Sequence, residues 1–366
     1  MKAALFCTSR YMGAAPEGVW PTPAGSYSTE VATRSYQTTL DQFRLADETG
    51  FDWVTVAEHH FSPFSLTPNP MVFAGALTQI VKRAKIALLG ASIPILNPIR
   101  VAEEVAMLDT LTNGRVVAGM LRGTGNEYVT YNYNPSESRA RFEEAMDLIK
   151  MAWTEPQPFG WEGRFFQYRS VSVWPRPVQQ PHPPIYMSAS SPESGDYAAK
   201  HKVGIGFAFT SVPQAKVAAN HYRDRARAYG WDPAPDDVIY RVGVHVADTD
   251  EQAYEDLEEA SKGPRHTGLS TANRAVEAAV KDAGYYGQDV EGQRGRLFAR
   301  GSLKDRIATG QLLIGSVDTV TKQIEDVKRE MGCGILDFTL VTQLGQRTSH
   351  AIELLGEKIV PRMHEM

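Results

Sequence analysis

Cysteine is nearly absent from this chain of 366 residues. The two cysteines, Cys7 and Cys333, lie far apart and form no CxxC or Cys/His pattern. Structural zinc and a disulfide framework both need such spacing, so the sequence argues against each. The histidines outside positions 59 and 60 are scattered without ligand spacing, and we therefore expect no metal site.

An excess of basic residues is also lacking. The net charge is −5 and the pI is about 6.0, which gives no positive field for a nucleic-acid backbone or an anionic membrane. The first residues, MKAALFCTSRYMGAAPEG, hold one Lys and a very short apolar stretch, unlike a signal peptide or a membrane span. We expect a cytoplasmic protein with a small-molecule partner and no nucleic-acid or membrane partner.

A dinucleotide fingerprint is missing as well. The turn after the first apolar run, CTSRYMGAAP, contains no GxGxxG, the motif that usually announces a doubly wound sheet. The later turn RGTGNEY has a GxG without a third glycine at the required spacing. This weak signal favours a local anion site and not a dinucleotide-binding fold.

The chain does contain an alternation of short apolar runs and amphipathic segments. Helical patterns occupy 38–50, 97–114 and 136–153, with Pro98 in a first turn and Gly50 as a stop. The candidate strands are 3–7, 53–57, 86–92, 116–121, 185–189, 203–208, 239–247 and 312–315. Strand followed by helix, repeated about eight times, predicts an α/β protein with a (β/α)8 TIM barrel, in a single domain over residues 1–366.

Residues 261–310 interrupt this alternation. The segment is polar, rich in glycine and arginine, and has at most a modest helix near 272–283. Two interpretations stand side by side, a surface insertion and a mobile lid over the barrel mouth, since long enzyme loops often act as lids. Either way, we expect an insertion near the C-terminal third of the barrel.

Three ionisable side chains, Glu58, His59 and His60, follow the apolar run FDWVTV. In a barrel the carboxyl ends of the strands face the active site. A lone histidine at a strand end is commonly just hydrogen-bonded there. Two adjacent imidazoles after an acid favour a general-base or hydrogen-bonding role, because histidine titrates near neutral pH.

Groups suited to an anion follow two further strands. They are Arg122, then Ser138 and Arg139 at the next helix start, and, within MSASSPES, Ser190, Ser191 and Ser194. Hydroxyls and free N–H groups at a helix start bind anions, and guanidinium groups complete a phosphate cradle. Each element alone is read as N-caps or surface charges. Together, on neighbouring strands, they favour a phosphate.

Several ordered motifs resemble one known family. FDWVTVAEHHF, IPILNPIRVAEEVAMLDTLTNGRVVAGMLRG, SRARFEEAMDLI, IYMSASSPES and IGSVDTVTKQI resemble, in order and spacing, the bacterial luciferase-like flavin-dependent monooxygenases. The match runs from the first strand to the C-terminal helix and is weakest at 8–35 and 261–310.

The resemblance implies a (β/α)8 barrel that binds FMN at the carboxyl ends of its strands. A separate NAD(P)H-dependent flavin reductase would supply reduced FMN, and O2 would add to it to form a flavin hydroperoxide. One oxygen atom would then pass to a small organic substrate, with ketones and aldehydes as candidates. Family members commonly form dimers, so we expect a homodimer.

Site residues follow from the resemblance by motif position. His59 matches the catalytic histidine beside the flavin ring, and Glu58 and His60 would brace the strand end. The FMN phosphate would be held by Arg122, Arg139, Ser191 and Ser194, with Ser190 contributing its backbone. The family's non-prolyl cis peptide under the flavin is expected within Leu89, Gly90 and Ala91.

Two positions depart from the luciferase pattern, and both concern the expected flavin site. Leu121 stands where the luciferase α-chain has a cysteine, which argues against an aldehyde-luminescence role, and Ser190 replaces an acid. The flat apolar slot that a flavin ring needs has five candidates, which ordinary core packing explains equally well: Cys7, Phe61, Leu121, Met187 and Phe207.

Two other functions share these motifs. One is a deazaflavin-dependent dehydrogenase or reductase of the same fold, which transfers hydride. The other is a non-catalytic flavin-binding subunit that supports a catalytic sibling. No second anion pocket is evident in the sequence, so we expect a neutral and fairly apolar substrate.

Overall fold

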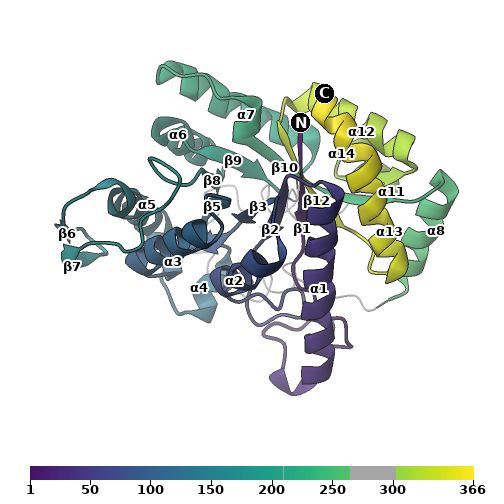
Figure 1. Cartoon of the computed structure of the whole chain (residues 1–366), viewed down its shortest axis with the longest axis horizontal. Coiled ribbons are helices and arrows are strands. Elements are labelled where there is room, and N and C mark those ends of the chain that lie inside the picture. The colour runs from purple at the N-terminus through teal and green to yellow at the C-terminus, as the bar shows by residue number, and fades with distance from the viewer. Residues whose placement is uncertain (209, 264–301) are drawn as a thin grey trace.

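Parallel strands close into a barrel in the computed structural model, which describes residues 1–208, 210–263 and 302–366. Eight strands form the wall within these ranges (Figure 1). In order they are β1 (Lys2–Phe6), β2 (Trp53–Val56), β3 (Lys85–Leu88), β5 (Val116–Leu121), β8 (Ile185–Ser188), β9 (Gly204–Phe207), β10 (Val238–Val246) and β12 (Ile335–Leu340). The ring closes because β10 pairs with both β9 and β12, and β12 pairs with β1. The predicted (β/α)8 TIM barrel is confirmed.

The wall differs from the predicted strands in one place. The eighth wall strand is β12, which the sequence reading missed, whereas the predicted strand at 312–315 forms β11 (Leu312–Gly315) on the carboxyl half of β10. β9 pairs with the amino half of β10, on the same edge that β11 occupies farther along the strand. The apolar run of β12 is interrupted by Asp337, which is buried. A charged residue within the run lowers its hydropathy, so the sequence pattern does not indicate a strand there.

Helices cover the outside of the barrel. The longer ones are α1 (Thr29–Thr49), α2 (Pro70–Ile80), α3 (Pro98–Leu111), α5 (Ser138–Thr154), α6 (Pro192–His201), α7 (Val212–Ala228), α8 (Asp250–Ser261), α12 (Val317–Met331) and α13 (Gln346–Leu354). Shorter pieces are α4 (Gly125–Thr130), α11 (Leu303–Ala308), a π-helix (Leu355–Ile359), α14 (Val360–Glu365) and 3-10 turns at Ala24–Ser26, Ile93–Ile95, Pro135–Glu137 and Pro235–Asp237. A hairpin of β6 (Phe159–Glu162) and β7 (Gln167–Val171) extends beside α5.

Local sequence explains where the helices begin. α3 starts at Pro98, as predicted, and the Asn97 side chain accepts hydrogen bonds from two free N–H groups of its first turn. α1 begins at Thr29, well before the predicted 38–50 segment, because Ser28 caps it. Its early turns bury small or polar residues such as Ala32 and Ser35, so no apolar stripe announces them.

The barrel lumen holds an apolar layer with a polar layer beside it. Trp53 on β2 and Tyr186 on β8 meet edge to face, with ring centroids 5.6 Å apart, although their strands are not neighbours. Arg241 on β10 pairs with Asp337 on β12 at 2.7 Å, and Thr55 donates to the same carboxylate at 2.7 Å. Buried charges persist only when paired in this way.

A second core lies between the strands and the helices. Cys7, Met187 and Phe207 belong to it, so of the two interpretations of these residues, ordinary core packing is the one that the structure favours. Both cysteines are free and buried. Burial raises the pKa of each thiol, that of Cys333 to about 12.

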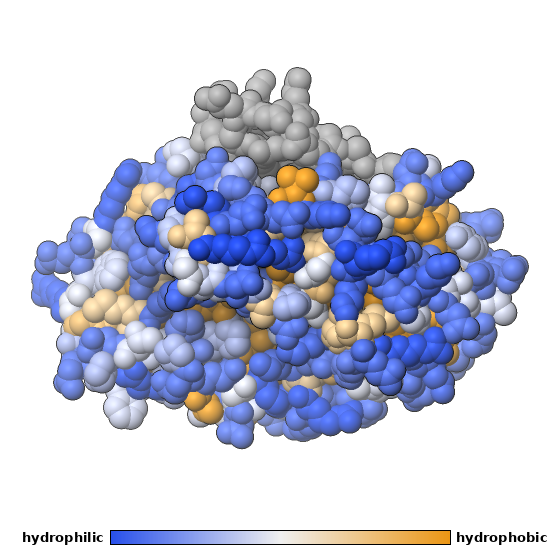
Figure 2. Space-filling model, turned by 90° about the horizontal axis from the view of Figure 1, so that it is seen from above, coloured by the Kyte–Doolittle hydropathy of each residue, from blue (hydrophilic) through white to orange (hydrophobic). Residues whose placement is uncertain are grey.

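The outer surface is mostly hydrophilic, with apolar residues in small separate patches when the molecule is viewed from above (Figure 2). No helix in the described ranges is long and apolar enough to cross a bilayer. The predicted insertion at 261–310 is described only at its edges, in the last residues of α8 and in α11. Residues 264–301 lie outside the described residues, so the lid interpretation stays a prediction.

Candidate active site at the barrel mouth

His59 lies just after the carboxyl end of β2 and faces a carboxylate from α4, the short helix that follows β5. Its Nδ1 is 3.4 Å from Oε1 of Glu127, and its ring packs edge-on against Phe64 at 5.3 Å between centroids. The His59 side chain is 13% exposed, while that of Glu127 is 1% exposed. The imidazole therefore remains accessible from the mouth while its acidic partner is buried.

The pKa of the Glu127 carboxyl group is lowered in spite of its burial. Burial raises the pKa of this carboxyl group, but hydrogen bonds from His59 and from Thr124 outweigh it and hold the pKa below its usual value. The Thr124 N–H donates to Glu127 Oε2 at 2.7 Å in the capping box of α4. The glycine-rich turn RGTGNEY thus uses its own carboxylate as a cap, and the local anion site predicted there stays a prediction.

Glu58 and His60 form a separate buried pair. His60 Nε2 lies 2.9 Å from Glu58 Oε1, and the Ser92 N–H donates to Glu58 Oε2 at 2.9 Å. The Trp20 indole N–H donates to the His60 carbonyl at 3.1 Å. Glu58 therefore ties the end of β2 to β4 (Ala91–Ser92), the short strand that follows β3.

The peptide bond between Leu89 and Gly90 is cis, as the resemblance implied. A Cβ at Gly90 would lie 2.6 Å from the Leu88 carbonyl oxygen and 2.7 Å from that of Gly119. Leu121 is the next nearest neighbour, at 3.0 Å. Gly90 and Ala91 are thus buried and closely packed between β3 and β5, next to the partly exposed Leu121.

The predicted phosphate-binding residues come together at the start of α6. Ser191 caps this helix, its Oγ accepting from the Ser194 N–H at 3.3 Å and lying 2.7 Å from the Ser194 hydroxyl. Burial and the like charge of Arg122 lower the pKa of Arg139, while the carboxylate of Glu193 at the start of α6 acts on it in the opposite direction. Guanidinium groups near a helix start suit an anion.

Glu193 in the first turn of α6 faces the same cluster. Its own backbone N–H and the Ser191 hydroxyl, followed by Arg139 and Arg122, lower the pKa of its carboxyl group. Ser190, just before the cap, is exposed, and Ser138 is buried at the first turn of α5. Phe61, at the mouth beside Trp20, is 54% exposed.

Sequence reasoning missed four residues of the mouth and lumen: Thr55, Glu127, Arg241 and Asp337. The only readable signal was the T-x-x-E spacing of Thr124 and Glu127, which predicts a capping box. The three lumen residues lie on strands as isolated polar positions. Their partners are on strands distant in sequence, so no local pattern could reveal them.

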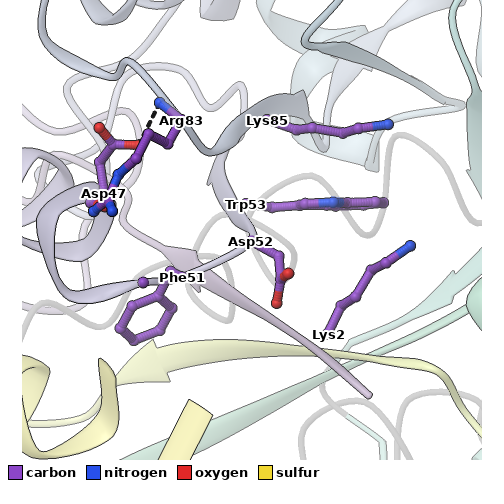
Figure 3. A pocket seen from close by; sticks show the side chains of 8 residues that line it. Lys2, Asp47, Phe51, Asp52, Trp53, Arg83 and Lys85 are labelled. Carbon is purple, nitrogen blue, oxygen red and sulfur yellow. Dashed lines mark hydrogen bonds between the residues drawn. The ribbon is translucent and has the colours of Figure 1, made fainter. Parts of the chain in front are cut away.

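A hollow of about 320 Å³ lies at the opposite end of the barrel. Lys2, Trp53 and Lys85 extend side by side at the amino ends of β1, β2 and β3, with Asp52 near Lys2 (Figure 3). Lys2 is paired with Asp236 at 2.5 Å. TIM-barrel enzymes bind substrates at the carboxyl ends of their strands, so this hollow is not the candidate site. The described residues contain no cluster of His, Cys, Asp and Glu suited to a metal ion.

The geometry defines a TIM-barrel protein with a partly exposed histidine at its mouth and with arginine and serine side chains near the start of α6. The family model described as luciferase-like monooxygenase matches residues 16–333. The chain therefore belongs to the luciferase-like monooxygenase family. One curated relative is the oxygenase component of a flavin-dependent trigonelline monooxygenase from Acinetobacter baylyi, 26% identical over 223 residues, which cover 60% of this chain and 61% of the relative.

Solved structures share the fold over nearly the whole chain. The monooxygenase RslO1 from Streptomyces bottropensis has a TM-score of 0.76 at 26% identity, covering 99% of each chain. The 3,6-diketocamphane monooxygenase of Pseudomonas putida, in complex with FMN, has a TM-score of 0.75 at 19% identity, covering 99% of this chain and 98% of its own. An F420-dependent secondary alcohol dehydrogenase reaches 0.69 at 18% identity, with 99% and 98% covered. The chain spans only 50% to 61% of the length of the first curated relatives.

Proposed function

We propose that this protein is the oxygenase component of a two-component FMN-dependent monooxygenase. The observation that carries the proposal is the convergence of Arg122 and Arg139 on the Ser191-capped start of α6, at the mouth that also holds His59. A phosphate-bearing flavin is the cofactor that suits both features. In this proposal, the closely packed backbone at Gly90 and Ala91 lies under the flavin ring.

The residues of the mouth have distinct roles in this proposal. Arg122 and Arg139 bind the FMN phosphate, together with the hydroxyls of Ser191 and Ser194 and the backbone at Ser190. Reduced FMN, when bound, supplies electrons that activate O2 for transfer to the substrate. His59, the accessible imidazole, accepts and returns a proton at the ring nitrogen that faces the mouth.

The proposal also names the partners. A separate NAD(P)H-dependent reductase supplies reduced FMN, in keeping with the oxygenase component among the relatives. The substrate is a small, neutral and fairly apolar molecule, and ketones and aldehydes are the first to test. We also propose a homodimer, which light scattering after size exclusion would measure.

Reconstitution tests the function directly. The protein, FMN, NADH and a general flavin reductase are incubated under ¹⁸O2 with a panel of ketones, aldehydes and sulfonates, and products are analysed by mass spectrometry. Incorporation of one labelled oxygen atom that depends on both protein and FMN is the expected result. Unlabelled products throughout, or products that His59→Ala forms at an unchanged rate, would contradict the proposal.

The phosphate cradle has a binding test of its own. Arg139→Ala should weaken FMN binding by about 10- to 100-fold, since a charge-assisted hydrogen bond contributes roughly 1.5–3 kcal/mol. Riboflavin, which lacks the phosphate, should bind both proteins equally. Arg100→Ala on the exposed face of α3, where Arg100 pairs with Glu104, is the matched control and should leave both affinities unchanged.

Two alternatives have clear outcomes in the same experiments. The F420-dependent structural neighbour supports a deazaflavin-dependent dehydrogenase, which would bind the deazaflavin tightly and reduce or oxidise a substrate without labelled oxygen. A non-catalytic partner subunit would bind FMN yet give no product without a sibling chain. Retention of an accessible His59 with a full cradle favours the catalytic role.

A further inference from the structure

We propose that Glu127 is a positioning residue that fixes the tautomer of His59, so that Nδ1 carries the hydrogen and Nε2 is left free toward the mouth. This inference rests on the proposed function for its catalytic consequence. Its structural content, a His–Glu dyad built from two different strand ends, stands on the contacts of the described residues alone.

The carboxylate is held rigidly before it meets the imidazole. Glu127 Oε2 accepts from the N–H and the hydroxyl of Thr124, and Oε1 accepts from Asn126 Nδ2 at 3.1 Å. The Tyr128 hydroxyl donates to the Arg122 carbonyl and closes the same turn. With these donors in place, the carboxylate has one acceptor position left, on Oε1, and His59 Nδ1 lies 3.4 Å from that oxygen.

Hydrogen-bond chemistry then assigns the ring nitrogens. An ionised carboxylate only accepts hydrogen bonds, so Nδ1 of His59 must be the donor, and in the neutral ring Nε2 is the nitrogen with a lone pair. The position of His59 as a whole is fixed by two further contacts. The His59 backbone N–H donates to the Thr67 carbonyl at 3.2 Å, and Phe64 packs against the ring.

The neighbouring histidine shows the opposite arrangement. His60 uses Nε2 toward Glu58 Oε1 at 2.9 Å, and its side chain is only 3% exposed. Two adjacent histidines thus have separate carboxylates on opposite ring nitrogens. Of these two histidines, only His59 combines a buried acidic partner with an accessible ring. We therefore assign His59 as the base with a fixed tautomer and His60 as a residue that stabilises the strand end.

Glu127→Gln is the informative substitution. A glutamine side chain retains the capping box, with its oxygen toward Thr124 and its NH2 group toward His59. It would then donate to Nδ1 and favour the other tautomer, with hydrogen on Nε2. Loss of the correct tautomer in a catalytic His–acid pair costs up to about 10⁴-fold in kcat.

Two readouts test the inference. ¹⁵N spectra of selectively labelled histidine should show the Nδ1–H tautomer for His59 in the wild type and the Nε2–H tautomer in Glu127→Gln, whether or not flavin is bound. In the reconstituted reaction, kcat should fall at least about 100-fold with KM and FMN affinity nearly unchanged, since ground-state binding is untouched. Asp305→Asn in the Ser302 capping box of α11 is the matched control and should alter neither readout.

The outcomes separate the two proposals. An Nε2–H tautomer in the wild type, or the same tautomer in the wild type and Glu127→Gln, overturns the dyad. If Asp305→Asn lowers the melting temperature and kcat as much as Glu127→Gln does, the role of Glu127 is merely structural, and the dyad is also overturned. If the wild type gives no labelled product while the tautomer responds as expected, the proposed function fails and the dyad stands.

Discussion

At the scale of single residues, the ion pair of Arg241 and Asp337 in the barrel lumen is energetically costly, because both charges are removed from water. The Asp337 side chain is 1% exposed and that of Arg241 is 13% exposed. The Arg241 guanidinium lies over the Phe6 ring, 3.5 Å from its centroid, and donates to the Leu89 carbonyl at 3.4 Å. The pair therefore links β10 and β12 to the end of β3, below the mouth.

Asp337→Ala should destabilise the protein by about 3–5 kcal/mol, because it leaves a guanidinium in the lumen without its carboxylate. The double variant Asp337→Ala/Arg241→Met should recover most of that loss. Urea unfolding measures both. Glu330→Ala, which breaks the exposed pair with Lys216, should cost less than about 1 kcal/mol. A similar small loss for Asp337→Ala would contradict this account of the lumen.

Sequence alone identified the residues of the site that sit in local motifs. His59, Arg122, Arg139 and Ser191 each lie just after a strand or at a helix start, where spacing is readable. Glu127 escaped attention because its role depends on a contact with a residue 68 positions away. A capping pattern predicts what an acid does for its own helix and nothing about a distant imidazole.

At the scale of elements, β3 and β5 pack closely against each other at Gly119. A Cβ at Gly119 would lie 2.0 Å from the Leu88 carbonyl oxygen, so no larger residue fits unless a strand shifts. β5 carries Arg122 at its end and β3 leads into Gly90. Their spacing therefore sets the position of Arg122 relative to Gly90.

Gly119→Ala should cost at least about 3 kcal/mol, the upper part of the range for overpacking, because the clash is with backbone. It should also weaken FMN binding. Gly75→Ala in α2, where nothing lies within 4 Å of the added Cβ, is the matched control and should stabilise the protein by about 0.5–1 kcal/mol. Thermal unfolding and an FMN titration on both variants provide the check, and equal stabilities would refute it.

The element pattern was largely predictable, with one instructive miss. α3 (Pro98–Leu111) and α5 (Ser138–Thr154) lie close to the predicted segments 97–114 and 136–153. β12 was missed because Asp337 in its middle looks like a loop residue to any hydropathy reading. Its burial is intelligible only when Arg241 and Thr55 from other strands are known to reach it.

At the scale of the whole molecule, buried carboxylates link the barrel to its surrounding helices. Asp256 on α8 accepts from His245 on β10 at 2.9 Å and from Arg347 on α13 at 2.6 Å. Burial raises the pKa of Asp256, but these hydrogen bonds outweigh it and lower that pKa. Glu127 has a lowered pKa for the same kind of reason.

Stability should therefore fall in acid. A carboxyl group whose pKa is lower in the folded state contributes fully above its unfolded pKa, roughly 4, and loses that contribution as the pH falls through its folded pKa. With two such groups the slope should reach at most about 2.7 kcal/mol per pH unit. Urea unfolding at about pH 5, 4 and 3 measures it, and Glu127→Gln should show a shallower slope. A stability that is flat over this range would exclude the linkage.

The two buried thiols can report when the structure around them opens to solvent. Cys7 on the rim of β1 and Cys333 before β12 flank the seam where the barrel closes. A thiol is alkylated only as an exposed thiolate, so each cysteine labels when its side of the seam parts from the helices. Pulse labelling followed by peptide mapping would time the two openings separately. It would tell whether the seam opens together with the rest of the barrel or before it.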